Sequence, residues 1–304
     1  MADHDKHGIV LLGSKELGLA AAAIIAEVAP GLLTAFVTPY DLGDIRSSHA
    51  AIIAWGQANH VPVHTVKNSN ELTSMVDALR PRVLIVVGWY RILSPDLLAR
   101  VPLGAVGIHA SLLPKYRGHA PLVWAIINGE RETGVTLFHF SDGIDNGDVI
   151  DQEEFHIQEA DDIESLLVHA KLSTVRLLSK YILKIYDGIN PRRKQNDLDA
   201  TYGGIRRPED GRINWMSSSS SIYNFIRAQS MPYPGAFSVR SDGAVVRIYR
   251  SRIYERPYCG VAGVVGNSIG NSSIIACGTG AILAEHVVVS PESSCPLRHG
   301  DRLC

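Results

Sequence analysis

The sequence Gly8-Ile-Val-Leu-Leu-Gly13 is a short apolar run that stops at a glycine, and a helix-like stretch follows it at residues 17–28. The run Val83-Leu-Ile-Val-Val87 is apolar in the same way, with no polar residue on either face. Strands of this kind are typical of a parallel sheet, because both of its faces are covered and neither needs polar side chains. These two runs therefore predict a parallel sheet with helices on both sides.

The same alternation of strands and helices continues through the first two-thirds of the chain. Further strands are predicted at residues 32–37, 61–66, 105–110 and 133–140, and further helices at residues 49–59, 70–79, 121–128 and 163–186. Asn70 is the predicted cap of the helix at residues 70–79. The alternation predicts an α/β domain over residues 1–200, with a doubly wound, mostly parallel sheet that is Rossmann-like.

The composition changes after the last of these helices. Residues 190–211 are polar and rich in Pro, Arg, Asp and Gly, and we place a linker at residues 201–212. A helix with a serine cap is predicted at residues 220–228, followed by brief alternating strands separated by Gly and Pro. Residues 213–304 are therefore predicted to form a smaller β-barrel domain that is OB-like.

The overall composition restricts the class of protein. The 304 residues are 46% hydrophobic and 20% charged, with a formal net charge of −2, which gives no broad attraction for nucleic acid or acidic membranes. No apolar run approaches the ~20 residues of a membrane helix, and residues 1–7 contain no signal-peptide core, so we expect a cytoplasmic enzyme. The four cysteines (Cys259, Cys277, Cys295 and Cys304) have no zinc-site spacing and are predicted to be thiols.

A histidine ends one of the predicted strands, in Gly107-Ile-His-Ala-Ser-Leu-Leu-Pro-Lys-Tyr-Arg-Gly118. Ligands bind at the carboxyl ends of strands in open parallel sheets, and Asp145-Asn-Gly-Asp148 follows a neighbouring strand. We therefore predict that His109 and Asp145 form a pair able to move protons, with no metal at the site. No G-x-S-x-G elbow surrounds Ser111, and its absence argues against a serine hydrolase. We interpret Ser111 as a residue that supports the local structure by hydrogen bonding.

Two further segments leave alternatives open. Lys115, Tyr116 and Arg117 fit either a solvated loop or a clamp for an anionic or hydroxylated substrate. For Asp148 we favour a role in shaping the turn around Gly147. The turn Gly13-Ser-Lys-Glu-Leu-Gly18 has neither a dinucleotide-binding nor a P-loop pattern, so it gives little support for NAD or ATP.

These residues resemble the folate-dependent formyltransferases, which include the enzymes acting on methionyl-tRNA and the sugar N-formyltransferases. The matching segments are His109, Ser111-Leu-Leu-Pro114, Arg117-Gly118, Glu132-Thr-Gly-Val-Thr136, Asp145-Asn-Gly-Asp148, Arg212-Ile-Asn-Trp215 and Pro232-Tyr-Pro-Gly-Ala-Phe237. The resemblance covers nearly the whole chain, and Lys115-Tyr-Arg-Gly-His-Ala-Pro-Leu-Val-Trp124 is similar to the branch that acts on nucleotide-linked amino sugars.

The resemblance implies transfer of a formyl group from 10-formyltetrahydrofolate to a primary amine. The implied catalytic residues are His109, Asp145 and position 107, and the implied substrate-binding residues are Ser111, Lys115, Tyr116 and Arg117. The implied donor-binding residues are Gly88, Trp89, Tyr90, Arg91 and Ile144. No metal and no covalent enzyme intermediate are required, and a homodimer is compatible with the family.

Position 107 departs from the family, because Gly107 stands where the relatives have an asparagine that donates to the developing oxyanion. Losing one such donor costs about 2.7–4 kcal/mol elsewhere. A water or protonated His109 could replace the donor. Alternatively, a carboxamide-sized opening could admit a larger acyl group, such as acetyl from acyl-CoA. The chain could also be a catalytically silent binding protein, or a variant made for study.

The predicted acceptor is a small amine. The tRNA-acting relatives carry a basic insertion after the second strand, whereas Thr38-Pro-Tyr-Asp-Leu-Gly-Asp-Ile-Arg-Ser47 has two acids and one Arg. Nucleic-acid binding needs clustered Lys and Arg. We therefore expect a nucleotide-linked amino sugar or an amine of natural-product biosynthesis, and no nucleic acid or membrane partner.

Overall fold

The computed structural model describes residues 7–291 and 296–304, and the chain divides into two compact units. The first unit extends to Gly118 and also includes Thr133–Phe155 and Val168–Tyr202. The second consists of His119–Glu132, His156–Leu167 and Gly203–Cys304. Each unit has its own sheet and its own hydrophobic core.

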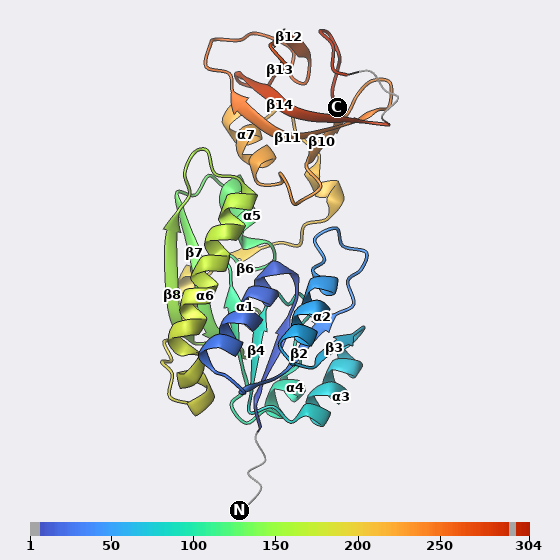
Figure 1. Ribbon diagram of the computed structural model, residues 1–304. Helices are drawn as coiled ribbons and strands as arrows, with labels where there is room; N and C mark the ends of the chain where they lie inside the picture. The colour runs from blue at the N-terminus through green and yellow to red at the C-terminus, as the bar shows by residue number, and fades with distance from the viewer. Residues whose placement is uncertain (1–6, 292–295) are drawn as a thin grey trace, which may run out of the picture. The chain divides into compact units, whose positions relative to one another are not determined.

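A seven-stranded sheet forms the centre of the first unit (Figure 1). In spatial order its strands are β3 (Val63–Val66), β2 (Leu33–Pro39), β1 (Ile9–Gly13), β4 (Val83–Val87), β5 (Ala105–His109), β7 (Glu132–His139) and β8 (Val149–His156). The first five strands are parallel to one another, and β7 is antiparallel to β5. The predicted doubly wound, mostly parallel sheet is confirmed, and its strand order reverses between β1 and β4, where ligands bind in such folds.

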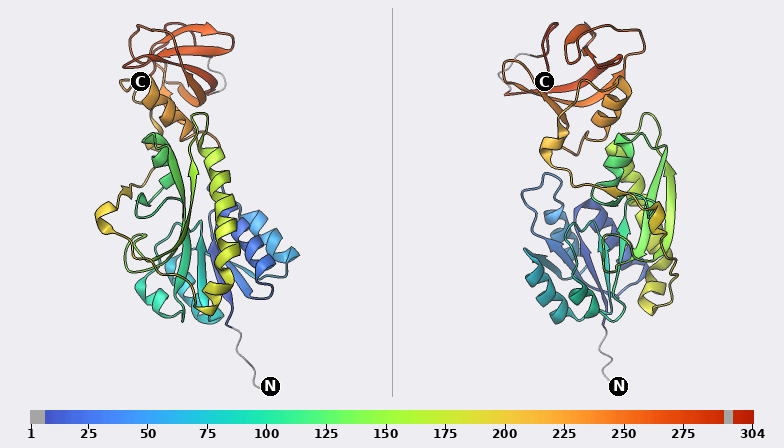
Figure 2. Two further views of the ribbon diagram at one scale, coloured as in Figure 1. Left: turned by 90° about the vertical axis from the view of Figure 1, so that its left-hand side faces the viewer. Right: turned by 180° about the vertical axis from the view of Figure 1, so that it is seen from behind.

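Helices cover both faces of this sheet (Figure 2). α1 (Lys15–Val28), α2 (His49–Ala58) and α6 (Ile163–Asp187) lie on one face, and Lys171 of α6 reaches Glu16 of α1 at 3.3 Å. α3 (Ser69–Leu79) and α4 (Pro95–Ala99) lie on the other. There Leu72 and Leu97 pack against Leu12 and Val86 of the sheet. Both faces of the central strands are thus buried, which explains why these strands read as apolar throughout.

Three local details differ from the sequence prediction. The cap of α3 is Asn68 and not Asn70, because Asn68 has extended backbone and its side chain accepts from Glu71 N at 2.9 Å. The edge strand β8 was missed because only its first residues are buried and the rest alternate with charge. The short helix α4, which begins after the Ser94 cap, was also missed.

The second unit contains a five-stranded antiparallel sheet. Its order is β10 (Ala236–Val239), β11 (Val245–Ile253), β14 (Ala281–Ser290), β13 (Ser272–Ala276) and β12 (Val265–Ile269). Helix α7 (Ser219–Arg227) begins at the serine cap Ser218 and packs Ile222 and Ile226 into the core with Trp215. The predicted smaller β domain is confirmed, although within the described ranges no pairing of β10 with β12 closes the sheet into a barrel.

Several short elements complete the two units. These are the two-stranded sheet β6 (Arg117–Gly118) and β9 (Tyr202–Gly203), the helix α5 (Pro121–Ile127), and the 3-10 helices η1 (Asp197–Asp199) and η2 (Pro208–Gly211). Within the second unit, the Arg206 guanidinium lies 5.1 Å from the Trp124 ring and 5.6 Å from the Phe225 ring. These contacts join α5 to α7. Among the described residues no helix has the length and apolar character that a membrane span requires.

Candidate active site

Strand β5 ends at His109, whose imidazole lies between two hydrogen-bond acceptors. The residue is 8% exposed. Its Nε2 lies 2.7 Å from the carbonyl oxygen of Tyr116, and Nε2 must donate because a carbonyl oxygen only accepts. Its Nδ1 lies 3.4 Å from Oδ2 of Asp145. The Tyr116 carbonyl therefore fixes the tautomer of the neutral ring, and Nδ1 is the nitrogen that can take a further proton beside a carboxylate.

Asp145 reaches His109 although it follows a strand that runs antiparallel to β5. His139 at the end of β7 pairs with Val106 near the start of β5, so residues 140–148 fold back toward His109. Asp145 has left-handed backbone, with φ of 49°, and its Oδ2 accepts a 2.7 Å hydrogen bond from the backbone N–H of Gly118. The two residues singled out in the sequence thus lie together, but a returning loop brings them there and not a parallel strand end.

Gly107 lies two residues before His109, so both face the same side of β5. A Cβ at position 107 would lie 2.3 Å from Cε2 of Phe140 and 3.0 Å from the carbonyl oxygen of Val86. The Phe140 ring stacks on Phe138, with 5.1 Å between centroids. The expected opening beside Gly107 is therefore wrong, because an aromatic ring fills the space. This finding removes the basis for expecting a larger acyl group there.

The loop after His109 contains the predicted substrate-binding residues Ser111, Lys115, Tyr116 and Arg117. Ser111 is fully buried and its hydroxyl donates to the carbonyl of Lys115 at 2.6 Å. Arg117 is only 2% exposed. Both side chains are therefore enclosed and hydrogen-bonded within the protein, where they support the loop, the role that the sequence favours for Ser111. The substrate contact that the resemblance implies for Ser111 and Arg117 stays a prediction. Tyr116 contributes its carbonyl to His109, and Lys115 is exposed.

Gln195, which no sequence motif includes, connects Arg117 to the loop that carries Asp145. Its Oε1 accepts from Nε and Nη2 of Arg117 at 3.1 and 2.9 Å. Its Nε2 donates to the carbonyl oxygens of Asp145 and Gly147 at 2.8 and 2.7 Å. Gln195 lies in the polar stretch that was interpreted as leading into a linker, where no pattern in the sequence distinguishes it.

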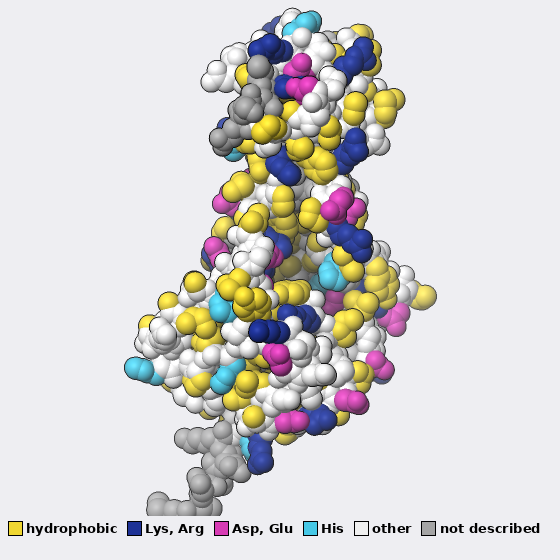
Figure 3. All heavy atoms as spheres, turned by 90° about the vertical axis from the view of Figure 1, so that its right-hand side faces the viewer, with side chains coloured by type: hydrophobic (Ala, Val, Ile, Leu, Met, Phe, Trp, Pro, Cys, Tyr) yellow, Lys and Arg dark blue, Asp and Glu magenta, His cyan; other side chains and the backbone are white. Residues whose placement is uncertain are grey.

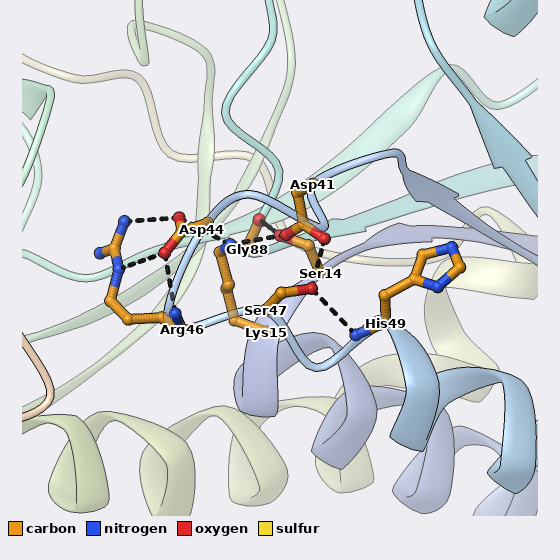
Figure 4. Close-up of polar contacts among 8 residues, drawn as sticks. All are labelled: Ser14, Lys15, Asp41, Asp44, Arg46, Ser47, His49 and Gly88. Atoms are coloured by element: carbon orange, nitrogen blue, oxygen red, sulfur yellow. Dashed lines mark hydrogen bonds and ion pairs between the residues drawn. The ribbon is translucent and has the colours of Figure 1, made fainter.

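The segment after β4 lies at the reversal point of the sheet. Gly88 has φ of 69°, and its carbonyl accepts a hydrogen bond from the hydroxyl of Ser14 after β1 (Figure 4). Trp89 has a buried Nε1 with no partner within the described part of the chain. Tyr90 is 47% exposed and Ile144, on the Asp145 loop, is 57% exposed. Two of the residues predicted to bind the formyl donor, Tyr90 and Ile144, thus expose apolar side chains, and a third, Trp89, has an unsatisfied N–H group. The other two predicted residues are Gly88 and Arg91.

The loop after β2 is closed by ion pairs (Figure 4). Lys15 Nζ lies 2.6 Å from Asp41 Oδ2 and 2.8 Å from Asp44 Oδ2, and Arg46 binds Asp44 at 2.9 Å. Burial by itself raises the pKa of Asp44, but hydrogen bonds from Arg46 and Lys15 outweigh it and lower that pKa well below its ordinary value. Two cations therefore face two carboxylates, and this loop offers no net positive charge.

His139 predicts a measurable acid sensitivity. Its Nε2 lies 2.6 Å from Asn190 Oδ1, and burial together with the nearby charge of Arg192 lowers the pKa of His139 below its ordinary 6.5. As the pH falls below the ordinary pKa of 6.5, His139 of the unfolded chain takes up a proton. His139 of the folded chain does not, so the free energy of unfolding falls. Between about pH 7 and about pH 5, urea titration should show a smaller loss of stability for His139→Gln than for the wild type. Parallel losses would contradict the assignment.

Other candidate sites do not involve the His109–Asp145 pair. The described residues hold no group of three or more His, Cys, Asp or Glu side chains that could bind a metal ion. Burial raises the pKa of Cys277 to about 11, Cys259 and Cys304 are exposed, and Cys295 lies outside the described residues. Two surface hollows, at residues 53–63 and around residues 129–131, contain neither member of the pair.

Two family patterns match this chain. Residues 36–181 match the formyl transferase pattern, and residues 206–295 match the pattern of the formyl transferase C-terminal domain. Solved structures that share the fold include two sugar-related formyltransferases. A sugar 3N-formyl transferase, determined in the presence of dTDP and 5-N-formyl-THF, has a TM-score of 0.68 at 20% identity over 91% of this chain and 97% of its own. An N-formyltransferase from Helicobacter canadensis, in complex with folinic acid and dTDP-3-aminofucose, has a TM-score of 0.66 at 22% identity over 91% and 98%.

The curated relatives include methionyl-tRNA formyltransferases, of which two are compared with this chain. The protein of Caldanaerobacter subterraneus is 38% identical over 193 residues, 63% of this chain, and the match spans only 61% of that relative's length. The protein of Pelotomaculum thermopropionicum is 33% identical over 283 residues, which are 90% of this chain and 88% of its own. A match of this extent, with both domain patterns in their order, establishes that the chain belongs to the formyl transferase family.

Proposed function

We propose that this protein transfers a formyl group from 10-formyltetrahydrofolate to the primary amine of a small acceptor. The observation that carries the proposal is the contact between His109 Nδ1 and Asp145 Oδ2 at 3.4 Å, at the end of a central strand in a chain of this family. The pair lies near the protein surface, because Asp145 has an exposed side-chain fraction of 19% and the adjoining residues 141–144 are exposed.

The reaction needs one bond formed, one broken and one proton moved. The amine nitrogen bonds to the formyl carbon, the bond from that carbon to N10 of the folate breaks, and the proton lost by the amine ends on N10. His109 Nδ1 is the atom placed to carry this proton, because Nε2 already donates to Tyr116. Asp145 stabilises the imidazolium that forms during the transfer. The bound folate supplies the activated formyl group.

The segment after β4 suits a folate donor. Tyr90 and Ile144 offer exposed aromatic and aliphatic surface, and the unsatisfied Nε1 of Trp89 is a donor in need of an acceptor. These features match a flat heteroaromatic ring that carries acceptor atoms. The two solved relatives described above contain folate compounds, which supports the same donor for this chain. The filled space at Gly107 favours formyl over acetyl as the transferred group.

The charges favour a small acceptor over tRNA. On the face shown in Figure 3, Lys and Arg side chains are interspersed with Asp and Glu, and no broad basic region is visible among the described residues of that face. The loop after β2 is neutralised by its own ion pairs. A nucleotide-linked amino sugar is the acceptor class we propose. The methionyl-tRNA relatives make aminoacylated initiator tRNA the acceptor to test against it.

Mass spectrometry of the purified protein's reactions tests the proposal. Each reaction contains both 10-formyltetrahydrofolate and acetyl-CoA, with nucleotide-linked amino sugars, simple diamines or initiator methionyl-tRNA as the acceptor. We expect a formylated amino sugar. An acetylated product would contradict the donor assignment, formylation of the tRNA alone would contradict the acceptor assignment, and no product with any pair would contradict the enzymatic function.

A further inference from the structure

We propose that Gln195 is a positioning residue that holds Asp145 beside His109, and that Arg117 fixes Gln195 for this task. The inference rests on the proposed function, since it assigns Gln195 a part in the same transfer. Gln195 binds the backbone of the Asp145 loop and not the carboxylate. Its effect is therefore on the geometry of the catalytic pair.

The carboxamide of Gln195 uses all of its hydrogen-bonding capacity. Its two N–H groups meet the carbonyl oxygens of Asp145 and Gly147, and its oxygen receives two N–H groups of Arg117. The orientation of the amide is fixed, because a flipped amide would set its donors against the donors of Arg117 and its oxygen against two carbonyls. Gln195 thus connects the backbone on both sides of Asn146 to the guanidinium of Arg117.

Arg117 is itself held in place by other residues, so it can fix the position of Gln195. Its guanidinium also binds Asp197 at 2.8 Å and the Tyr202 hydroxyl at 3.2 Å. Burial by itself lowers the pKa of Arg117, but Asp197 and Tyr202 raise it above its ordinary value, so the group stays charged. The next residue, Gly118, donates its N–H to Oδ2 of Asp145. Both residues of β6 therefore position Asp145. Arg117 acts on its backbone through Gln195, and Gly118 binds its carboxylate directly.

The backbone of Asp145 shows why this support is needed. A φ of 49° is left-handed backbone, which is uncommon outside glycine, although Asp and Asn adopt it more often than other residues. The two hydrogen bonds from Gln195 restrain the backbone of this loop, and the bond from Gly118 restrains only the carboxylate. Its contact with His109 is already 3.4 Å long, so a small movement removes it. A displacement of about 1 Å at a catalytic group lowers rates by up to about 100-fold.

Two variants test the inference, and a third is the control. Gln195→Glu keeps the shape of the side chain and its pairing with Arg117, but it has no N–H for Asp145 and Gly147. Gln195→Leu removes both sets of contacts. Gln229→Leu is the control, because Gln229 also pairs with an arginine, Arg206 at 2.8 Å, and has no contact with the catalytic pair. Melting temperature, kcat and KM, and the imidazole NMR signals of His109 are measured for each.

We expect Gln195→Glu to fold but to melt below the wild type, because a carboxylate oxygen then faces the carbonyl oxygens of Asp145 and Gly147. It should also lose at least about 10-fold in kcat with little change in donor KM, and shift the His109 ring signals. Gln195→Leu should shift the same signals, and Gln229→Leu should leave kcat and the signals unchanged. Unshifted His109 signals in folded Gln195→Glu would overturn the inference. The signals decide the question even if the wild type transfers no formyl group, an outcome that would instead refute the proposed function.

Discussion

Replacement of His109 by Asn, or of Asp145 by Asn, lowers kcat for formyl transfer by at least about 100-fold. The first change removes the ring nitrogen that takes the proton, and the second removes the negative charge that stabilises the imidazolium. The two residues act as one unit, so the double variant should lose little more than either single variant. Steady-state rates with saturating donor and acceptor measure the effect.

The control for this pair is His299→Asn, which changes an exposed histidine of the second unit. It should retain the wild-type rate. Asp145→Asn should melt close to the wild type because the two side chains have nearly the same shape, and His109→Asn should melt lower because it removes a buried ring and its hydrogen bond to the Tyr116 carbonyl. Rates are therefore compared at a temperature at which every variant is folded. Rates near that of the wild type in both His109→Asn and Asp145→Asn would show that the pair does not carry the reaction. A double variant far slower than either single variant would show that the two residues act separately.

Asparagine at position 107, the residue that the resemblance implies for the relatives, is expected to damage this protein. Even the first carbon of that side chain would lie 2.3 Å from the ring of Phe140 and 3.0 Å from a backbone oxygen on β4. Overpacking of this kind costs about 1–3 kcal/mol. Gly107→Asn should therefore have a lower free energy of unfolding and a lower rate, as measured by urea titration and formyl-transfer assay.

A second substitution shows whether Phe140 is the cause. In Gly107→Asn with Phe140→Ala, space for the carboxamide returns, so the two changes together should cost less than the sum of each alone, by about 0.5–3 kcal/mol. Gly43→Asn is the control, because a Cβ there meets nothing within 4 Å. Additive costs, or a Gly107→Asn protein as stable as the wild type, would mean that the Phe140 ring does not occupy the space that an asparagine at position 107 needs.

The strands and helices of the first unit were predictable because their chemistry is local. Buried parallel strands such as Val83–Val87 are apolar on both faces, and the helices between them have clear limits. The importance of His109 and Asp145 could also be inferred from their residue types at strand ends. The path that joins them could not, because nothing in the sequence shows that β7 is antiparallel to β5 or that residues 140–148 turn back.

The remaining features depend on contacts between distant residues. Phe140 fills the space beside Gly107 only because two strands are paired in one register. The sequence left Arg117 open between a solvated loop and a substrate clamp, because the residues that enclose it lie about 80 positions later in the chain. Gln195 is one polar residue within a polar segment, and its role is visible only where its four hydrogen bonds converge.

The most direct measurement follows one labelled carbon. The protein is mixed with 10-[13C]formyltetrahydrofolate and a nucleotide-linked amino sugar, and the 13C signal is recorded over time. The wild type should convert the donor signal into that of an N-formyl amide on the sugar, and the His109→Asn protein should do so at least about 100-fold more slowly. A formamide signal that grows equally fast in both proteins, or that never appears with the wild type, would contradict the account.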